Sequence, residues 1–356
     1  RTMAAELSEQ VFWSALLALQ FGFQPAITSK FATGKLITSS AIIVQEGVLK
    51  VGFGLQALVL SSGLSHIKSW TFTESLKKAG IPAVLYAVQN LLTLLAYDEI
   101  DGLTYNILNQ SKLLWNAILV WIFLNEKFSY AQIVSLLLIM STTILVVTDP
   151  AKSDHQNEAK SGAFALGATY TLIASCISGI ASTLIQYNLQ KLKRNSYLMS
   201  AELGFYSAVT LILKVAVERQ LEVGDGLRIK NKGFFTGFDE WSLLPLVSTS
   251  LGGIVVGQVT RTVGGVGKAY ALLTGLLIST FWHSDEITIR LMLAVPLVVV
   301  AFWLRIQTKS VGGNTAAAAA SHRHDDDDAG KNTSSSNGRR RSARIRNLAG
   351  KKARER

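Results

Sequence analysis

Apolar residues along this chain fall into blocks that are separated by short polar segments. A helix needs about 20 apolar residues to cross the hydrocarbon core of a membrane, so each block predicts a membrane-spanning helix. The pattern predicts an all-α polytopic membrane protein. Its ten predicted spans lie at residues 11–29, 38–60, 80–97, 101–124, 130–148, 161–189, 198–218, 241–262, 267–283 and 287–306.

The overall composition agrees with this pattern. Hydrophobic residues make up 49% of the 356 residues and charged residues only 17%, whereas a soluble domain carries about 25% charged residues. The one cysteine, Cys176, lies inside a predicted span. A single cysteine excludes an intrachain disulfide.

An even number of spans places both termini on the same side of the membrane. Cytosolic loops are enriched in Lys and Arg close to the spans. Such residues follow the sixth and tenth predicted spans, at Lys191, Lys193, Arg194, Arg305 and Lys309. Both termini are therefore predicted to be cytosolic.

The net charge of +11 is concentrated in the C-terminal tail. From residue 307 to the end the chain has 12 Lys/Arg and 5 Asp/Glu, in a sequence of low complexity. We predict a transmembrane domain at 1–306 and a disordered basic cytosolic tail at 307–356. The segment "HRHDDDD" in this tail could chelate a metal, but we expect a solvated charge run. No metal site, cofactor or nucleic-acid partner is predicted.

Polar residues inside the fourth span form a stripe. Tyr105, Asn109, Lys112 and Asn116 are spaced so that they share one face of a helix. A charge in mid-membrane costs about 2.5–3.5 kcal/mol on insertion scales, and hydrogen bonds between helices return only about 0.6 kcal/mol each. The stripe therefore predicts a solvated central cavity, with structural contacts between helices as the alternative.

The second and third spans also carry polar residues. Glu46 and Lys50 are four residues apart, so they can neutralise each other on one helical face; a structural role and a role in substrate binding both stay open. In the third span Tyr86, Gln89 and Asn90 share one face.

Basic residues recur in the second half, where Arg261 and Lys268 stand among glycines. The segment "GGVGKA" is not a P-loop, because Ala269 replaces the required Ser/Thr. Lysines that converge on a cavity favour an anion, and ammonium groups suit phosphate. The residues thus predict transport of a phosphorylated metabolite. No HExxH or GxSxG motif occurs, so no catalytic residues and no enzyme are expected.

These stretches resemble the nucleotide-sugar transporters, in the branch of the drug/metabolite transporter superfamily that carries CMP-sialic acid and UDP-sugars. "YAVQNLL" is similar to the family's "YAxQNN", and "TYNILNQSK" is similar to "VYQVTYQLK". Arg261 followed by "GKAYALLTG" is similar to a ninth-span pattern of a basic residue, a spacer and "LKGFATSLS". This match places Lys268 on the family's lysine.

The resemblance implies ten helices in two inverted five-helix repeats around a central site. It implies an antiporter that exchanges cytosolic nucleotide sugar for luminal nucleoside monophosphate across the Golgi or ER membrane. Lys112 and Lys268 would hold the phosphates, aided by Tyr86 and Tyr105. Candidates for contacts to the base or sugar are Gln89, Asn90 and Asn109. The oligomeric state stays open, a homo-oligomer included.

Departures from the family pattern also occur in the sixth and seventh spans. Gln186 stands where the branch usually has Glu, and "MSAE" replaces "RNxQ", so that Ser200 replaces Asn and Glu202 replaces Gln. Substrate discrimination is expected here, which makes Ser200 a predicted substrate-binding residue and leaves the base and sugar open. The structural or gating candidates are Glu46, Lys50, Gln186 and Arg261.

Two alternatives to a nucleotide-sugar antiporter stay open at this point. One is an organic-phosphate or other metabolite exchanger of the same superfamily, including the plastid types. The other is a non-transporting membrane scaffold, for which the tail is the only argument.

Overall fold

The computed structural model describes residues 3–31, 36–63, 65–100, 105, 108–126, 128–147, 161–283, 296–297 and 300. Every element assigned within this part of the chain is a helix. The chain divides into two units, Arg1–Phe302 and Trp303–Arg356. The second unit, and with it the predicted tail at 307–356, lies outside the described residues.

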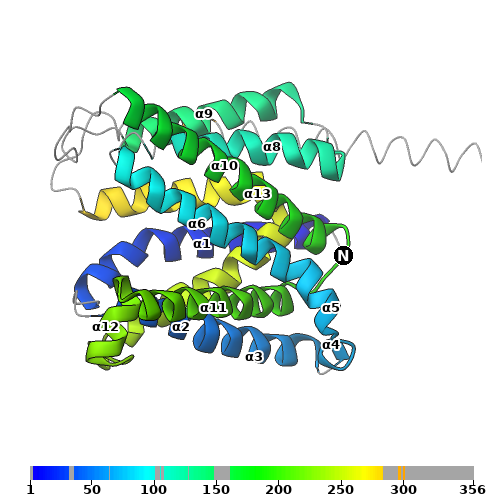
Figure 1. Ribbon diagram of the computed structural model, residues 1–356. Helices are drawn as coiled ribbons and strands as arrows, with labels where there is room; N and C mark the ends of the chain where they lie inside the picture. Colours follow the sequence, from blue (N-terminus) through cyan, green and yellow to red (C-terminus); the bar gives the residue numbers. More distant parts are fainter. Residues whose placement is uncertain are drawn as a thin grey trace, which may run out of the picture. The chain divides into compact units, whose positions relative to one another are not determined.

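The helices follow one another along the first unit (Figure 1). They are α1 (Met3–Phe31), α2 (Thr38–Ile43), η1 (Val44–Lys50), α3 (Val51–Ser62), α4 (Ser65–Lys68), α5 (Phe72–Ser75), η2 (Leu76–Gly80), α6 (Ile81–Glu99), α8 (Ser111–Leu124), α9 (Tyr130–Val147), α10 (Ser161–Gln190), α11 (Ser196–Leu221), α12 (Gly224–Lys232) and α13 (Leu243–His283). The two π-helical elements, η1 and η2, lie inside longer continuous helices.

Six helical stretches of the described chain are long and apolar enough to cross a membrane: Ala5–Phe31, Thr38–Ser62, Phe72–Glu99, Phe164–Gln190, Ser196–Leu221 and Leu243–Ser279. Two shorter apolar helices, Ser111–Leu124 and Tyr130–Thr142, lie in the fourth and fifth predicted spans. Predicted spans one to nine therefore all contain helix. The tenth, 287–306, lies outside the described residues except for 296–297 and 300.

The fourth predicted span contains a local irregularity at Gln110. There, α8 begins only at Ser111, after a turn at Gln110. Tyr105 is helical but lies before that turn. Gln110 keeps right-handed helical angles, φ −64° and ψ −21°, and residues 106–107 lie outside the described part of the chain, so the stripe from Tyr105 to Asn116 stays a prediction.

The eighth and ninth predicted spans form two helical segments that meet at Gly264 and together carry the label α13. The helix is broken at a single residue, Gly264, whose φ of 76° and ψ of 178° are not helical. This region of backbone space is essentially open to glycine alone. The break lies between the two predicted spans, 241–262 and 267–283, where the apolar pattern predicts the spans to be separated.

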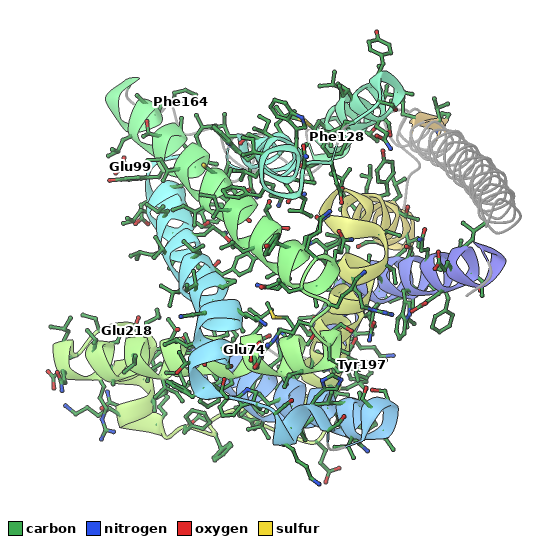
Figure 2. The ribbon with its side chains drawn as sticks, turned by 90° about the vertical axis from the view of Figure 1, so that its right-hand side faces the viewer. Glu74, Glu99, Phe128, Phe164, Tyr197 and Glu218 are labelled. Atoms are coloured by element: carbon green, nitrogen blue, oxygen red, sulfur yellow. The ribbon has the colours of Figure 1, made fainter. Side chains whose placement is uncertain are left out.

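Antiparallel packing of α6 and α10 is visible in Figure 2, where Glu99 and Phe164 mark neighbouring ends of the two helices. Gly167 of α10 lies directly against Glu99 and Ile100. Helices in a membrane associate through such small residues, since the lipid leaves no hydrophobic driving force between them.

The second half of α13 packs against the helix that carries Lys112. Tyr270, Leu273 and Leu277 form a buried apolar cluster, and Leu113 of α8 and Leu138 of α9 pack against it. The first half of α13 packs along α1, where Leu17 is buried with Val255 and Val259. Helix α13, from the second half of the sequence, thus packs with both of its segments against helices from the first half (Figure 1).

Helix α12 lies outside the candidate spans, in the long loop after the seventh predicted span, and the apolar pattern does not predict it. At its start, the Asp225 carboxylate accepts hydrogen bonds from the Ser39 backbone N–H and hydroxyl, at 2.9 and 2.8 Å. Partial burial alone would raise the pKa of Asp225, but the Ser39 hydrogen bonds and the Arg228 charge outweigh it and hold this pKa below its ordinary value. The contact fastens α12 to the start of α2.

Candidate substrate site

Lys112 and Lys268 lie close together although they come from opposite halves of the sequence. Each is half-buried, and the positive charge of Lys112 acts on Lys268. Asn116, one turn after Lys112 on α8, touches Gly265 at the start of the second half of α13. The structure therefore places the two lysines on helices that contact each other.

Neither lysine has a hydrogen-bond or salt-bridge partner among the described residues. Two like charges in an apolar setting are unfavourable, because desolvation and mutual repulsion act in the same direction. An anion between the two ammonium groups would relieve both. This pair is the strongest chemical feature of the described chain.

Lys50 lies in a different environment. Its ammonium contacts the Glu46 carboxylate at 2.7 Å, and its side chain is only 14% exposed. The aliphatic stem packs on Gly204 of α11 and Gly253 of α13. The predicted ion pair is confirmed, and its charge is neutralised within the protein.

The break in α13 is surrounded by side-chain amides. Gln186 of α10 is 3% exposed, and its Oε1 accepts the Gly265 N–H at 2.8 Å. Its Nε2 donates to Gln190 Oε1 at 2.9 Å. Gln190 Nε2 in turn lies 3.1 Å from the Thr260 carbonyl and 3.3 Å from the Arg261 carbonyl. Gln186, predicted as a structural or gating candidate, thus contacts the break directly.

Gln190 is a site residue that the sequence reasoning missed. The available signal was its position four residues after Gln186 in an apolar span, because residues at that spacing share a helical face. Asn116 of the predicted stripe contacts α10, because its Oδ1 accepts a hydrogen bond from the Thr183 hydroxyl at 3.4 Å.

The polar face of α6 is partly open. Tyr86 and Gln89 are half-buried and Asn90 is exposed. No hydrogen bond in the described part of the chain joins these three residues to either lysine. Their predicted contacts with substrate stay predictions.

Tyr105 is packed into a small core rather than facing open space. It is buried with Ala96 and Ile100, and its ring centroid lies 4.3 Å from that of Tyr97. Its hydroxyl lies 3.0 Å from the Thr93 hydroxyl of α6. The predicted role of Tyr105 beside the phosphate stays a prediction.

Asn109 and Ser200 make helix-to-helix contacts. Asn109 Oδ1 accepts from the Ser175 hydroxyl of α10 at 3.4 Å. Ser200 is buried on α11, with its hydroxyl against Gly257 of α13. Neither residue contacts the lysines through a hydrogen bond of the described chain, and their predicted roles stay untested.

Glu202 is fully engaged in a buried ion pair. Its carboxylate accepts from Arg194 Nε at 3.0 Å and from Arg194 Nη2 at 2.5 Å. It also accepts from Trp70 Nε1 at 2.8 Å, and the side chain is only 5% exposed. The pair ties the segment before α5 to the turn between α10 and α11, which is an architectural role.

A cavity of about 760 Å³ lies beside the first half of α13. Its lining includes Glu9 of α1, Gln190, Lys193 and Arg194 at the end of α10, and Arg261 of α13. Arg261 forms an ion pair with Glu9. Among the predicted site residues of the described chain, Arg261 alone lines this cavity, so the cavity and the lysine pair are separate features.

Comparison with known proteins identifies the family. The nucleotide-sugar transporter family model matches residues 26–305. The UDP-N-acetylglucosamine transporter ROCK1 of Arabidopsis thaliana is 36% identical over 271 residues, which cover 76% of this chain and 82% of that protein. The UDP-N-acetylglucosamine transporter of Bos taurus is 29% identical, over 68% of this chain and 74% of its own length.

Two further likenesses are more distant. A UDP-galactose transporter of Schizosaccharomyces pombe is 24% identical over 65% of each chain. One solved crystal structure superimposes with a TM-score of 0.57 at 12% identity, covering 84% of this chain and 96% of the other, which shows a shared fold alone.

The family and these relatives are transporters rather than enzymes. The apolar helices agree with a multi-pass membrane protein. The family model spans most of the chain, and the ROCK1 alignment independently supports the match. The chain therefore belongs to the nucleotide-sugar transporter family.

Proposed function

We propose that this protein exchanges a UDP-sugar, with UDP-N-acetylglucosamine as the first candidate, for UMP across the Golgi or ER membrane. The observation that carries the proposal is the pair Lys112 and Lys268, which converge without a carboxylate partner in the described chain. The names of the relatives direct the choice of sugar toward N-acetylglucosamine.

The phosphates of the nucleotide would bind between the two ammonium groups. Lysine is a compact point charge that suits phosphate, and hydrogen bonds between charged groups are worth about 1.5–3 kcal/mol each. Because both ligand and counter-ligand carry phosphate on the same nucleoside, one site can serve both. Gln89, Asn90 and Asn109 would then offer amides to the base or sugar, with Tyr86 and Ser200 as further contacts.

Exchange rather than one-way transport follows from the charges. An empty site leaves two lysine charges repelling each other, and reorienting them through the membrane without an anion is unfavourable. A bound UDP-sugar or UMP neutralises them. The loaded carrier would therefore change conformation more readily than the empty one.

Alternating access would use ten helices arranged as two inverted repeats. The first half of the chain supplies Lys112 and the second supplies Lys268, so each proposed repeat contributes one phosphate-binding charge. The cavity beside Arg261 would face the cytosol, because its lining includes Lys193 and Arg194, which the charge pattern assigns to that side.

The proposal is tested with purified protein in liposomes that are loaded with UMP or left empty. Uptake is measured with radiolabelled UDP-N-acetylglucosamine, UDP-galactose, CMP-sialic acid and glucose 6-phosphate. We expect uptake of UDP-N-acetylglucosamine that depends on internal UMP and is lost in Lys268→Ala. Lys214→Ala is the matched control, because Lys214 is 44% exposed and paired with Glu218.

Two results would contradict the proposal. Preferred uptake of glucose 6-phosphate would indicate an organic-phosphate exchanger. Absence of uptake for every substrate, by a protein that stays folded, would favour a non-transporting scaffold.

A further inference from the structure

We propose that Gln186 and Gln190 are positioning residues for Lys268: their linked amides maintain the break in α13 and thereby orient the lysine toward phosphate. This inference rests on the proposed function for its final step. The amide geometry at the break is independent of it.

The break at Gly264 removes hydrogen bonds from the helix. In a continuous helix the Gly265 N–H would donate to the Arg261 carbonyl, four residues earlier. The non-helical backbone of Gly264 interrupts this register. A buried backbone group that loses its partner is costly, so substitutes are needed for both the donor and the acceptor.

The two glutamines substitute for that lost bond as a chain of hydrogen bonds. The Gly265 N–H donates to Gln186 Oε1 at 2.8 Å. Gln186 Nε2 then donates to Gln190 Oε1 at 2.9 Å. Gln190 Nε2 completes the chain by donating to two adjacent carbonyls, that of Arg261 at 3.3 Å and that of Thr260 at 3.1 Å. The donor and the acceptor separated by the break are therefore both satisfied.

The side chain of Gln186 packs closely against the backbone of the break. A Cβ atom at Gly264 would lie 2.8 Å from Gln186 Nε2, and one at Gly265 would lie 3.2 Å from Gln186 Oε1. The same Cβ at Gly265 would lie 2.6 Å from Asn116 Nδ2 of α8. The amide of Gln186 is thus enclosed between α10, α8 and the break.

The orientation of Lys268 depends on this arrangement, because Lys268 lies within the first turn after the break. The direction of that turn depends on how the Gly265 N–H is held. A binding group must be held within about 0.5 Å of its productive position, so a loosened turn would weaken phosphate binding before it unfolded the protein.

A second glutamine pair provides an internal comparison. Gln20 and Gln24 of α1 are also four residues apart and are linked by a 3.0 Å amide bond. They donate to the Ser248 and Pro245 carbonyls in the first half of α13, at 3.3 and 3.2 Å. There the helix is unbroken, so this pair joins two helices without replacing a lost bond.

The test compares Gln186→Leu with Gln20→Leu in the purified full-length protein. Hydrogen exchange is measured on ligand-free protein for residues 258–268 and 243–252, and the Kd of UMP is measured by calorimetry. Gln186→Leu should increase exchange at 258–268 and weaken UMP binding about tenfold. Gln20→Leu should increase exchange only at 243–252 and change the Kd less than about twofold.

Gln186→Glu keeps an oxygen that can accept the Gly265 N–H, but it removes the donation to Gln190 and adds a buried carboxylate. Its Kd should stay within about threefold of the wild type, which separates positioning from loss of fold if Gln186→Leu is unstable. Unchanged exchange at 258–268 in Gln186→Leu would overturn the amide chain. Increased exchange with an unchanged Kd would overturn the positioning role.

Failure of the proposed function has a different signature. In that case the wild-type protein itself would bind neither UMP nor UDP-N-acetylglucosamine. The hydrogen-exchange comparison between the two leucine variants would still decide whether the amide chain exists.

Discussion

Lys50 and Lys268 are both lysines within apolar helices, and the protein treats them in opposite ways. Lys50 contacts Glu46 at 2.7 Å, and its stem rests on Gly253. Lys268 has the like charge of Lys112 beside it and no described carboxylate partner. The comparison teaches that a charge inside a span indicates a ligand only where the fold does not supply its counter-charge.

The largest effect predicted from this comparison is on transport. Lys268→Ala and Lys112→Ala should each lower kcat/KM for UMP-dependent uptake of UDP-sugar at least about 100-fold, because each removes a charged contact worth about 3 kcal/mol to phosphate. Initial uptake rates in liposomes measure this loss. Near-normal uptake rates in both variants would contradict the proposal that these two lysines, unlike Lys50, bind the substrate.

Lys50→Met should act on stability instead. It leaves the Glu46 carboxylate largely buried without its partner, and breaking a buried pair costs about 3 kcal/mol. The double change Glu46→Gln with Lys50→Met removes both charges and should recover most of this loss. Thermal unfolding in detergent measures both. A weakened UMP affinity in a well-folded double variant would place the pair in the substrate site.

Gly264→Ala tests the backbone break that precedes Lys268, and it should lower the stability of the protein. An alanine at φ 76° and ψ 178° is strained, at a cost of about 2 kcal/mol. The control is Gly52→Ala on α3, where a Cβ would meet no atom within 4 Å. That change should be neutral or stabilise the helix slightly. Equal unfolding temperatures for the two variants would contradict the account of the break.

The smallest predicted effect concerns a paired charge outside the membrane. Because the folded-state pKa of Asp225 lies below the ordinary value of 3.8, its ionised form stabilises the fold above that value. This contribution is lost as the pH falls through the folded-state pKa. Asp225→Asn should therefore cost less than about 1 kcal/mol at neutral pH and nothing once the wild-type group is protonated. A pH series of unfolding temperatures checks the sign.

The apolar blocks predicted where the helices lie, because burial in lipid requires each span to satisfy its own backbone hydrogen bonds. Lys112 and Lys268 could also be predicted from the sequence, because a charged residue without a nearby counter-charge stands out in an apolar span. The contacts of Tyr105 could not be predicted, because its partners Thr93 and Tyr97 lie on another helix. Helical spacing shows which residues share a face of one helix, but it does not show which residues of other helices they contact.

The break in α13 shows the same limit. Glycines at 264, 265 and 267 indicate flexibility, but nothing local selects Gly264 as the break. That choice depends on Gln186, 78 residues earlier, whose amide lies against it. Glu202 likewise could not be assigned from its own span, because Trp70 and Arg194 meet it only in the folded chain.

The central claim is that Lys112 and Lys268 share one phosphate, and a double-mutant cycle on UMP affinity tests it most directly. The Kd of UMP is measured for the wild type, Lys112→Met, Lys268→Met and the double variant. Shared binding predicts a large loss in each single variant and a double variant no more than about threefold weaker than the weaker single variant. Losses that multiply, or a single variant that binds UMP like the wild type, would contradict the claim.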